Sequence, residues 1–141
     1  MKKIVIAVLS VLVFTFILIV LITNLSSFNY NKNNKLVEKH FVSKNKNITD
    51  IAVEQYYGDN QYYIVSYKSE NKEYLSILDE KENKIFNIEK TSLYNLKKDF
   101  KIGYKYDKLI YEVKEVKKDG FTYSYYDALT GEFIKSIKLN K

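Results

Sequence analysis

A run of apolar residues near the N-terminus constrains this chain more than any other feature. Residues 4–22 carry no charge, and only Ala7, Ser10 and Thr15 among them are not Val, Leu, Ile or Phe. As a helix, this run extends about 28 Å, close to the thickness of the hydrocarbon core of a bilayer. We therefore expect a transmembrane anchor over residues 1–25, with a short cytoplasmic N-terminus.

The charges around this run predict its orientation. Lys2 and Lys3 precede the run directly, whereas Lys32 and Lys35 follow it at a distance. Positive charge beside a span stays in the cytoplasm, so we expect a single-pass cell-membrane protein with its C-terminal domain extracytoplasmic. A cleaved signal peptide is the alternative, but its apolar core is typically about 7 to 15 residues long and a small-x-small site follows. Residues 23–27 offer no such site, which favours an uncleaved signal-anchor.

The residues after the anchor predict a first folded unit over residues 35–89. Residues 26–34 are polar and Asn-rich, which is typical of a tether. A short amphipathic helix is then expected over residues 35–43, because Leu36, Val37, His40 and Phe41 share one helical face. Turn residues next separate four stretches rich in β-formers, at residues 48–57, 62–68, 73–78 and 84–88.

A second unit of the same kind is expected over residues 90–141. Thr91 or Ser92 can cap a short helix that carries Leu93, Leu96 and Phe100. Four further strands are expected near residues 101–106, 109–116, 121–126 and 132–137. The predicted fold class is α+β, with each unit formed by a short helix packed on an antiparallel sheet.

A shift of 48 positions aligns the two units. It places Tyr63 on Tyr111, Val65 on Val113, Ser76 on Ser124 and Asp79 on Asp127. Each aspartate is expected to accept backbone N–H groups within a hairpin turn. The same shift places Asn83 on Gly131, two residue types that tolerate the left-handed backbone such turns need. We assign both aspartates to turn structure rather than to catalysis.

The inventory of reactive residues argues against an enzyme. The chain has no cysteine and a single histidine, so thiolate nucleophiles, disulfides and multi-histidine metal sites are excluded. No glycine-rich phosphate loop or metal-binding helix motif occurs, and no cofactor is expected. Direct base readout of nucleic acid relies on arginine, which is also absent. His40, on an apolar helical face, is expected to be a structural residue.

Lysines and tyrosines supply the remaining candidates for binding. Residues 34–141 hold 20 lysines against 17 acids, a surplus of three that permits weak contact with anionic wall polymers. Phe121, Tyr123 and Tyr125 alternate with Thr122, Ser124 and Tyr126, so one row is expected in the core and the other at the surface. Exposed tyrosines suit protein interfaces, although they also form strands without any partner.

Two stretches carry a family resemblance. Residues 109–139, LIYEVKEVKKDGFTYSYYDALTGEFIKSIKL, resemble the end of a PepSY-type unit with its D-x-x-T-G turn, here Asp127, Thr130 and Gly131. Residues 62–86, YYIVSYKSENKEYLSILDEKENKIF, form the earlier unit. With the anchor and tether, the whole layout resembles the TseB-like cell-wall elongation regulators of Gram-positive bacteria. It departs from their pattern at residues 90–99, where a longer helix is usual, so the second unit is expected to be trimmed or packed differently.

The resemblance implies a cystatin-like module outside the membrane that binds a penicillin-binding protein and modulates cell-wall synthesis during elongation. The chain would then be a non-enzymatic regulator, and the two aspartate turns would be structural. An inhibitor or chaperone-like PepSY module acting on a secreted peptidase is the alternative from the same resemblance. A polyanion-binding envelope domain is a further alternative, suggested by the lysines. The partner-binding residues are not indicated by any motif.

Overall fold

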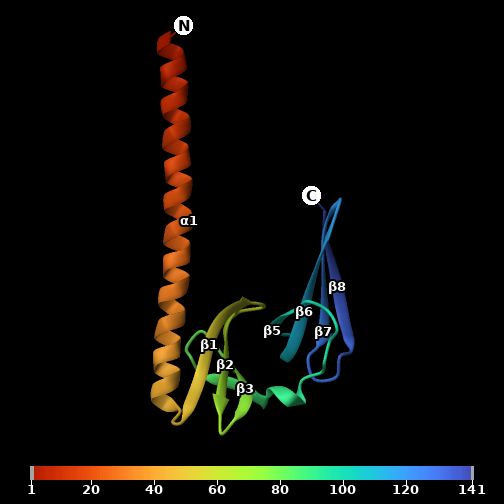
Figure 1. Ribbon diagram of the computed structural model, residues 1–141. Helices are drawn as coiled ribbons and strands as arrows, with labels where there is room; N and C mark the ends of the chain where they lie inside the picture. The colour runs from red at the N-terminus through yellow and green to blue at the C-terminus, as the bar shows by residue number, and fades with distance from the viewer. Residues whose placement is uncertain (1, 141) are drawn as a thin grey trace. The chain divides into compact units, whose positions relative to one another are not determined.

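The computed structural model describes residues 2–140 and separates the chain into two compact units, Met1–Leu36 and Val37–Lys141. Its elements are one long helix followed by two antiparallel four-stranded sheets, which is an α+β arrangement. Figure 1 shows the helix in red to orange, the first sheet in yellow to green and the second sheet in green to blue.

The helix α1 spans Lys2–Lys44 and contains the apolar run. Among the described residues it is the one helix long and apolar enough to cross a membrane. Its mean hydropathy there is 2.4, and none of the apolar window is buried inside the protein. Large side chains such as Phe16 and Ile22 are more than 60% exposed. The prediction of an N-terminal helix that could span a membrane, or act as a signal anchor, is confirmed, while Met1 lies outside the described residues.

The predicted tether is helical. Residues 26–34 continue α1 without a break, and residues 35–43 are the end of the same helix rather than a separate one. Neither stretch contains Gly or Pro, so nothing interrupts the backbone ladder of hydrogen bonds. The helix ends where the backbone N–H and the side-chain amide of Asn45 both donate to the carbonyl of Phe41, at 3.1 and 2.8 Å. Asn47 then takes a left-handed conformation with φ 59°.

Sheet A is an antiparallel meander that follows α1 directly. Its strands, in spatial order, are β1 Ile48–Tyr57, β2 Gln61–Ser69, β3 Lys72–Leu78 and β4 Lys84–Glu89. The end of α1 covers one face, where Val37 and Phe41 are buried against residues of β2 and β3. The opposite face joins a second core through Ile64, Leu75 and Ile77. Because β2 and β3 are buried on both faces, their sequences read as apolar runs rather than as a strict alternation.

Sheet B repeats the same meander order. A three-residue 3-10 helix, η1 Lys90–Ser92, leads to β5 Lys101–Lys105, β6 Lys108–Lys117, β7 Gly120–Asp127 and β8 Phe133–Asn140. All eight predicted strands are therefore present, and β8 runs further toward the C-terminus than expected. The predicted internal repeat is visible in the pairing. Val65 lies opposite Ser76 in sheet A, and their counterparts 48 positions later, Val113 and Ser124, lie opposite each other in sheet B.

The helix predicted after Thr91 or Ser92 does not form. Beyond η1, Leu93 is already extended, with φ −79° and ψ 143°. The backbone N–H of Tyr94 donates to the carbonyl of Ala128 at 2.8 Å, and the carbonyl of Tyr94 accepts the hydroxyl of Tyr111 at 2.7 Å. A helix this short is marginal by itself. The bonds to sheet B therefore decide the conformation, and Leu93 still packs against the core. The second unit has a sheet without its own α-helix.

The two sheets share one hydrophobic core. Tyr56 of β1 and Tyr111 of β6 both belong to it, each about 2% exposed. The ring of Tyr56 lies directly over Gly103 of β5, because a Cβ at Gly103 would overlap that ring. A glycine within a strand marks such a close approach. The two predicted units, whose boundary falls at residues 89 and 90, are therefore packed together in one compact body.

Candidate interaction surface

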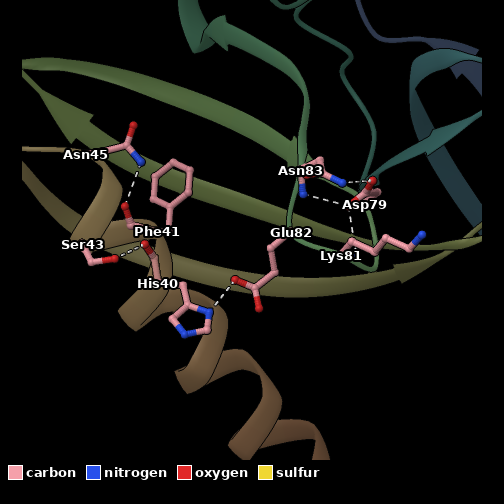
Figure 2. Close-up of polar contacts among 8 residues, drawn as sticks. All are labelled: His40, Phe41, Ser43, Asn45, Asp79, Lys81, Glu82 and Asn83. Atoms are coloured by element: carbon pink, nitrogen blue, oxygen red, sulfur yellow. Dashed lines mark hydrogen bonds and ion pairs between the residues drawn. The ribbon is translucent and has the colours of Figure 1, made fainter.

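The turn between β3 and β4 is organised around Asp79. One oxygen of its carboxylate accepts the backbone N–H groups of Lys81 and Asn83 at 2.9 and 2.8 Å, and the other accepts the side-chain amide of Asn83 at 2.9 Å. Figure 2 shows these bonds. The Asn83 amide, with the backbone donors, lowers the pKa of Asp79 below its ordinary value, although its partial burial opposes this. The geometry is that of a turn, with no group poised for chemistry.

Asp127 occupies the corresponding place between β7 and β8. Its carboxylate accepts the backbone N–H groups of Leu129 and Thr130 at 2.9 and 3.2 Å. The hydroxyl of Thr130 in turn accepts the N–H of Glu132 at 3.2 Å. Gly131 has φ 76°, and its N–H donates to the carbonyl of Asp127 at 2.8 Å. These contacts place the three residues of the D-x-x-T-G pattern in one turn.

The left-handed residue of the first turn differs from the prediction. Glu82 has φ 62°, and Asn83, expected to match Gly131, does not. The turn after Asp79 is one residue shorter than the turn after Asp127. The residue with the left-handed backbone therefore lies one position closer to the aspartate in the first turn. Asn83 serves instead as the donor to Asp79. A glutamate is an unusual residue for this conformation.

The side chain of Glu82 makes a contact that the sequence did not suggest. Its carboxylate lies 2.8 Å from Nδ1 of His40, near the end of α1 (Figure 2). The His40 side chain is 58% exposed, so the pair adds little stability by itself. Next to it, Phe41 is buried, and Nζ of Lys84 lies 5.4 Å from the centre of its ring. His40 thus lies at the exposed edge of the seam between the end of α1 and sheet A, where it contacts the turn between β3 and β4.

A shallow hollow of about 260 Å³ lies between sheet A and the start of β5. Apolar side chains including Ile64 and Phe100 line it, with Glu54 and Lys101 at its polar positions. Lys101 donates to the backbone carbonyl of Gln55 at 3.2 Å. Within residues 2–140 no group of three or more His, Cys, Asp or Glu side chains could hold a metal ion.

The most distinctive surface lies on one face of sheet B. Residues directly opposite each other on antiparallel strands share a face. Three such rows cross β6, β7 and β8, and together they form what we call the aromatic–lysine face: Glu112, Tyr125 and Lys135; Lys114, Tyr123 and Ile137; and Val116, Phe121 and Leu139. The row nearest Tyr56 is buried at Tyr125, whereas the row farthest from it is exposed at Val116 and Leu139.

The inner row is tied to sheet A through Glu112. The hydroxyl of Tyr56 donates to the Glu112 carboxylate at 3.1 Å. Burial, with this carboxylate nearby, raises the pKa of Tyr56 well above its ordinary value. Burial likewise raises the pKa of Tyr125 to about 12, and Glu112 adds to the effect. The carboxylate of Glu112, the acid of this face, therefore contacts phenol groups that remain neutral at physiological pH.

Lysines lie over the aromatic rings of this face. Nζ of Lys114 is 4.5 Å from the ring centre of Phe121 and 5.6 Å from that of Tyr123. The ring of Tyr106, in the turn after β5, meets Tyr125 edge-on, with centroids 6.4 Å apart. Lys105 lies over both rings, and Lys135 lies 5.1 Å from the ring centre of Tyr106. Each contact is worth about 0.5 to 1 kcal/mol at an exposed site.

Charge on this face is strongly one-sided. Across the described part of the chain, none of Lys105, Lys114 and Lys135 forms an ion pair with a carboxylate. By contrast, Lys138, on the opposite face of β8, pairs with Asp119 at 2.6 Å. The face is therefore cationic as well as aromatic.

The outer row adds an apolar patch. The side chains of Val116 and Leu139 are 71% and 51% exposed, and Phe121 is half-buried between them. We predicted that the side chains on one face of β7 would lie in the core and those on the other face at the surface. This prediction is confirmed only in part. Tyr125 is buried, but Tyr123 and Phe121 on the same face are half-buried, as are Thr122, Ser124 and Tyr126 on the other. Packing against sheet A covers only the inner end of the aromatic–lysine face.

The sequence pointed to some residues of this surface but not to others. Lys105 and Lys114 stand among the lysines counted in the sequence, and Tyr125 among its tyrosines. Glu112 and Tyr106 carried no local signal, because their positions depend on contacts across strands. The glycine at 103 within a strand pattern was a usable signal of close approach.

Comparison with known proteins supports the fold. The structure resembles that of the YpmB protein from Bacillus subtilis, with a TM-score of 0.60 and 19% sequence identity, over 72% of this chain and 94% of that chain. At this level of identity the match concerns the fold alone. No protein-family model matches the sequence, and no curated protein matches it significantly.

Proposed function

We propose that this chain is a single-pass membrane protein whose extracytoplasmic domain binds a cell-wall synthesis enzyme of the penicillin-binding class and modulates cell elongation. In this proposal α1 is an uncleaved anchor with its N-terminus in the cytoplasm. The domain is a PepSY-type, cystatin-like module of the TseB-like kind. It performs no catalysis and acts through protein contact.

The observation that carries the proposal is the aromatic–lysine face on an anchored domain. Half-buried Tyr123 and Phe121, with exposed Val116 and Leu139, form a contiguous surface of the kind that protein interfaces use. The match to YpmB supports the fold, and the sequence resemblance to TseB-like regulators supports an envelope role. The non-catalytic part of the proposal rests on the absence of cysteine from the sequence and on its single histidine.

Crosslinking in intact cells tests the partner. We expect the full-length protein to crosslink to a penicillin-binding protein identified by mass spectrometry, and its deletion to change cell length. Recovery of the protein without any penicillin-binding protein, together with unchanged cell length, would overturn the proposal.

Protease shaving with fractionation tests the topology. We expect the domain of the full-length protein to be digested by external protease in intact cells and the protein to sediment with membranes. A protein lacking residues 1–24 should instead remain in the soluble cytoplasmic fraction. A full-length protein that is soluble and protected from protease would contradict the anchored location.

A further inference from the structure

The aromatic–lysine face and the adjoining Lys105 carry three lysines against a single acid, Glu112. Lys105, Lys114 and Lys135 lie over aromatic rings without a carboxylate partner. The acid of the face, Glu112, accepts a hydrogen bond from Tyr56. Complementary charge therefore points to a ligand with carboxylate or phosphate groups.

The apolar outer row narrows the choice of ligand. Val116 and Leu139 are more than half exposed and flank Phe121. A polyanion such as a wall polymer would neutralise the lysines but leave these apolar side chains in water. A protein segment that carries both acidic and apolar residues covers both parts. The combination therefore favours a protein segment over a polymer.

The edge of sheet B borders this face. β8 is the last strand in the order β5-β6-β7-β8, so along the described residues it pairs on one side only, with β7. An added strand would place alternate side chains beside Lys135, Ile137 and Leu139. β8, FIKSIKLN, carries two lysines and no acidic residue. A second copy of this strand would therefore bring like charge rather than complementary charge to the edge, which disfavours a second copy as the occupant.

We propose that β8 and the aromatic–lysine face together bind an extended, acidic segment of the partner protein by strand addition. The added strand places an acidic side chain beside Lys135 and apolar side chains beside Ile137 and Leu139, while Lys114, on β6, attracts the acidic segment from farther across the face. This inference rests on the proposed function, because it describes the segment of the wall-synthesis enzyme that the domain binds.

A synthetic probe tests the chemistry directly. The probe is a fluorescently labelled peptide with glutamate, valine and leucine at alternate positions, separated by threonine, added to the full-length protein in nanodiscs. Anisotropy should show saturable binding, and a peptide with lysine in place of glutamate should not bind. Equal binding of both peptides would overturn the inference.

Matched charge reversals locate the site. The Lys114→Glu/Lys135→Glu variant should weaken probe binding by about tenfold or more, because two attractions become repulsions. The control, Lys46→Glu/Lys97→Glu, has the same net charge and alters two exposed lysines away from the face, so it should leave binding unchanged. Equal loss in both variants would mean general charge attraction and would contradict a defined site. Circular dichroism confirms that each variant keeps its strands.

The apolar side chains of β8 separate a protein segment from a wall polymer. Ile137→Ser/Leu139→Ser should weaken binding of the peptide, since both side chains lie on β8, where the added strand would cover them. Polyglycerol phosphate is the competing ligand. If it bound more tightly than the peptide and ignored the serine substitutions, the surface would be a polymer site and the inference would be wrong.

Crosslinking of the same variants in cells separates this inference from the proposed function. If a penicillin-binding protein is crosslinked by the wild type and by the control but not by Lys114→Glu/Lys135→Glu, both stand. If every variant crosslinks it equally, the function stands and the surface assignment fails. If none crosslinks it, the function fails, and peptide binding alone judges the surface.

Discussion

The ring of Tyr56 lies where a side chain at Gly103 would otherwise be. This contact joins β1 of sheet A to β5 of sheet B, and it places the Tyr56 hydroxyl within reach of Glu112. The inner end of the aromatic–lysine face is therefore positioned by a residue of the other sheet. Damage to this contact should loosen both the core and the surface.

Gly103→Ala should destabilise the domain. The new Cβ would overlap the Tyr56 ring, and overpacking of this kind costs about 1 to 3 kcal/mol. Thermal unfolding of the full-length protein in detergent, followed by circular dichroism in the strand region, measures the change. Thr122→Ala, a half-buried position of the same sheet, is the control. A Gly103→Ala protein as stable as the control would show that the ring contact is not tight.

Stability should fall in alkaline solution. An unfolded tyrosine ionises near pH 10, whereas burial raises the pKa of Tyr125 to about 12 in the folded domain. The raised pKa means that this stabilisation is complete below pH 10 and is lost as the pH rises from 10 to about 12. The loss is at most about 1.4 kcal/mol per pH unit for one such group.

Tyr125→Phe checks the alkaline effect. This variant lacks the titrating hydroxyl, so its unfolding free energy should depend less steeply on pH above 10 than that of the wild type. Urea unfolding at several pH values, with phenolate absorbance recorded in parallel, measures both quantities. Identical slopes for the two proteins would contradict the assignment.

Phe41→Ala should undock the end of α1 from sheet A. Phe41 is 4% exposed and packs against Tyr67, with ring centres 5.2 Å apart. Removal of a buried phenylalanine costs about 3 to 5 kcal/mol. Hydrogen exchange of residues 37–44 and of β2 should increase.

Two substitutions in the same segment serve as controls for Phe41→Ala. Val42→Ala alters an exposed residue of the same helix turn and should have little effect. His40→Ala breaks only the exposed contact with Glu82 and should cost about 1 kcal/mol or less. If His40→Ala increased hydrogen exchange as much as Phe41→Ala, the polar contact rather than packing would hold the helix end.

Gly131→Ala should destabilise the turn after β7. Gly131 has φ 76°, which a residue with a Cβ adopts only with strain, and a Cβ there would also overlap the ring of Tyr94. A loss of more than about 1 kcal/mol is expected. Glu82→Gly, at the corresponding left-handed position of the other turn, should be neutral or stabilising if His40 contributes little. A Gly131→Ala protein as stable as the wild type, or a Glu82→Gly protein that is clearly destabilised, would overturn this account of their geometry.

Local patterns determined much of this protein. The apolar run predicts a helix that could cross a membrane, because its length and composition match the hydrocarbon core of a bilayer. The eight strands follow from β-forming residues between turn signals, and Asp79 and Asp127 mark two turns because an aspartate bonds to the backbone within a few residues. Each of these relationships spans a short stretch of chain, so the sequence by itself contains it.

Tertiary contacts decided the rest. The helix expected after Thr91 is replaced by an extended segment because Tyr94 bonds to Ala128 and Tyr111, far along the chain. The left-handed conformation falls on Glu82 rather than Asn83, which sets the carboxylate of Glu82 against His40. The aromatic–lysine face arises only when β6, β7 and β8 pair in register and Tyr56 covers one end of it. Such contacts join residues far apart in sequence, and no local pattern determines which of them form.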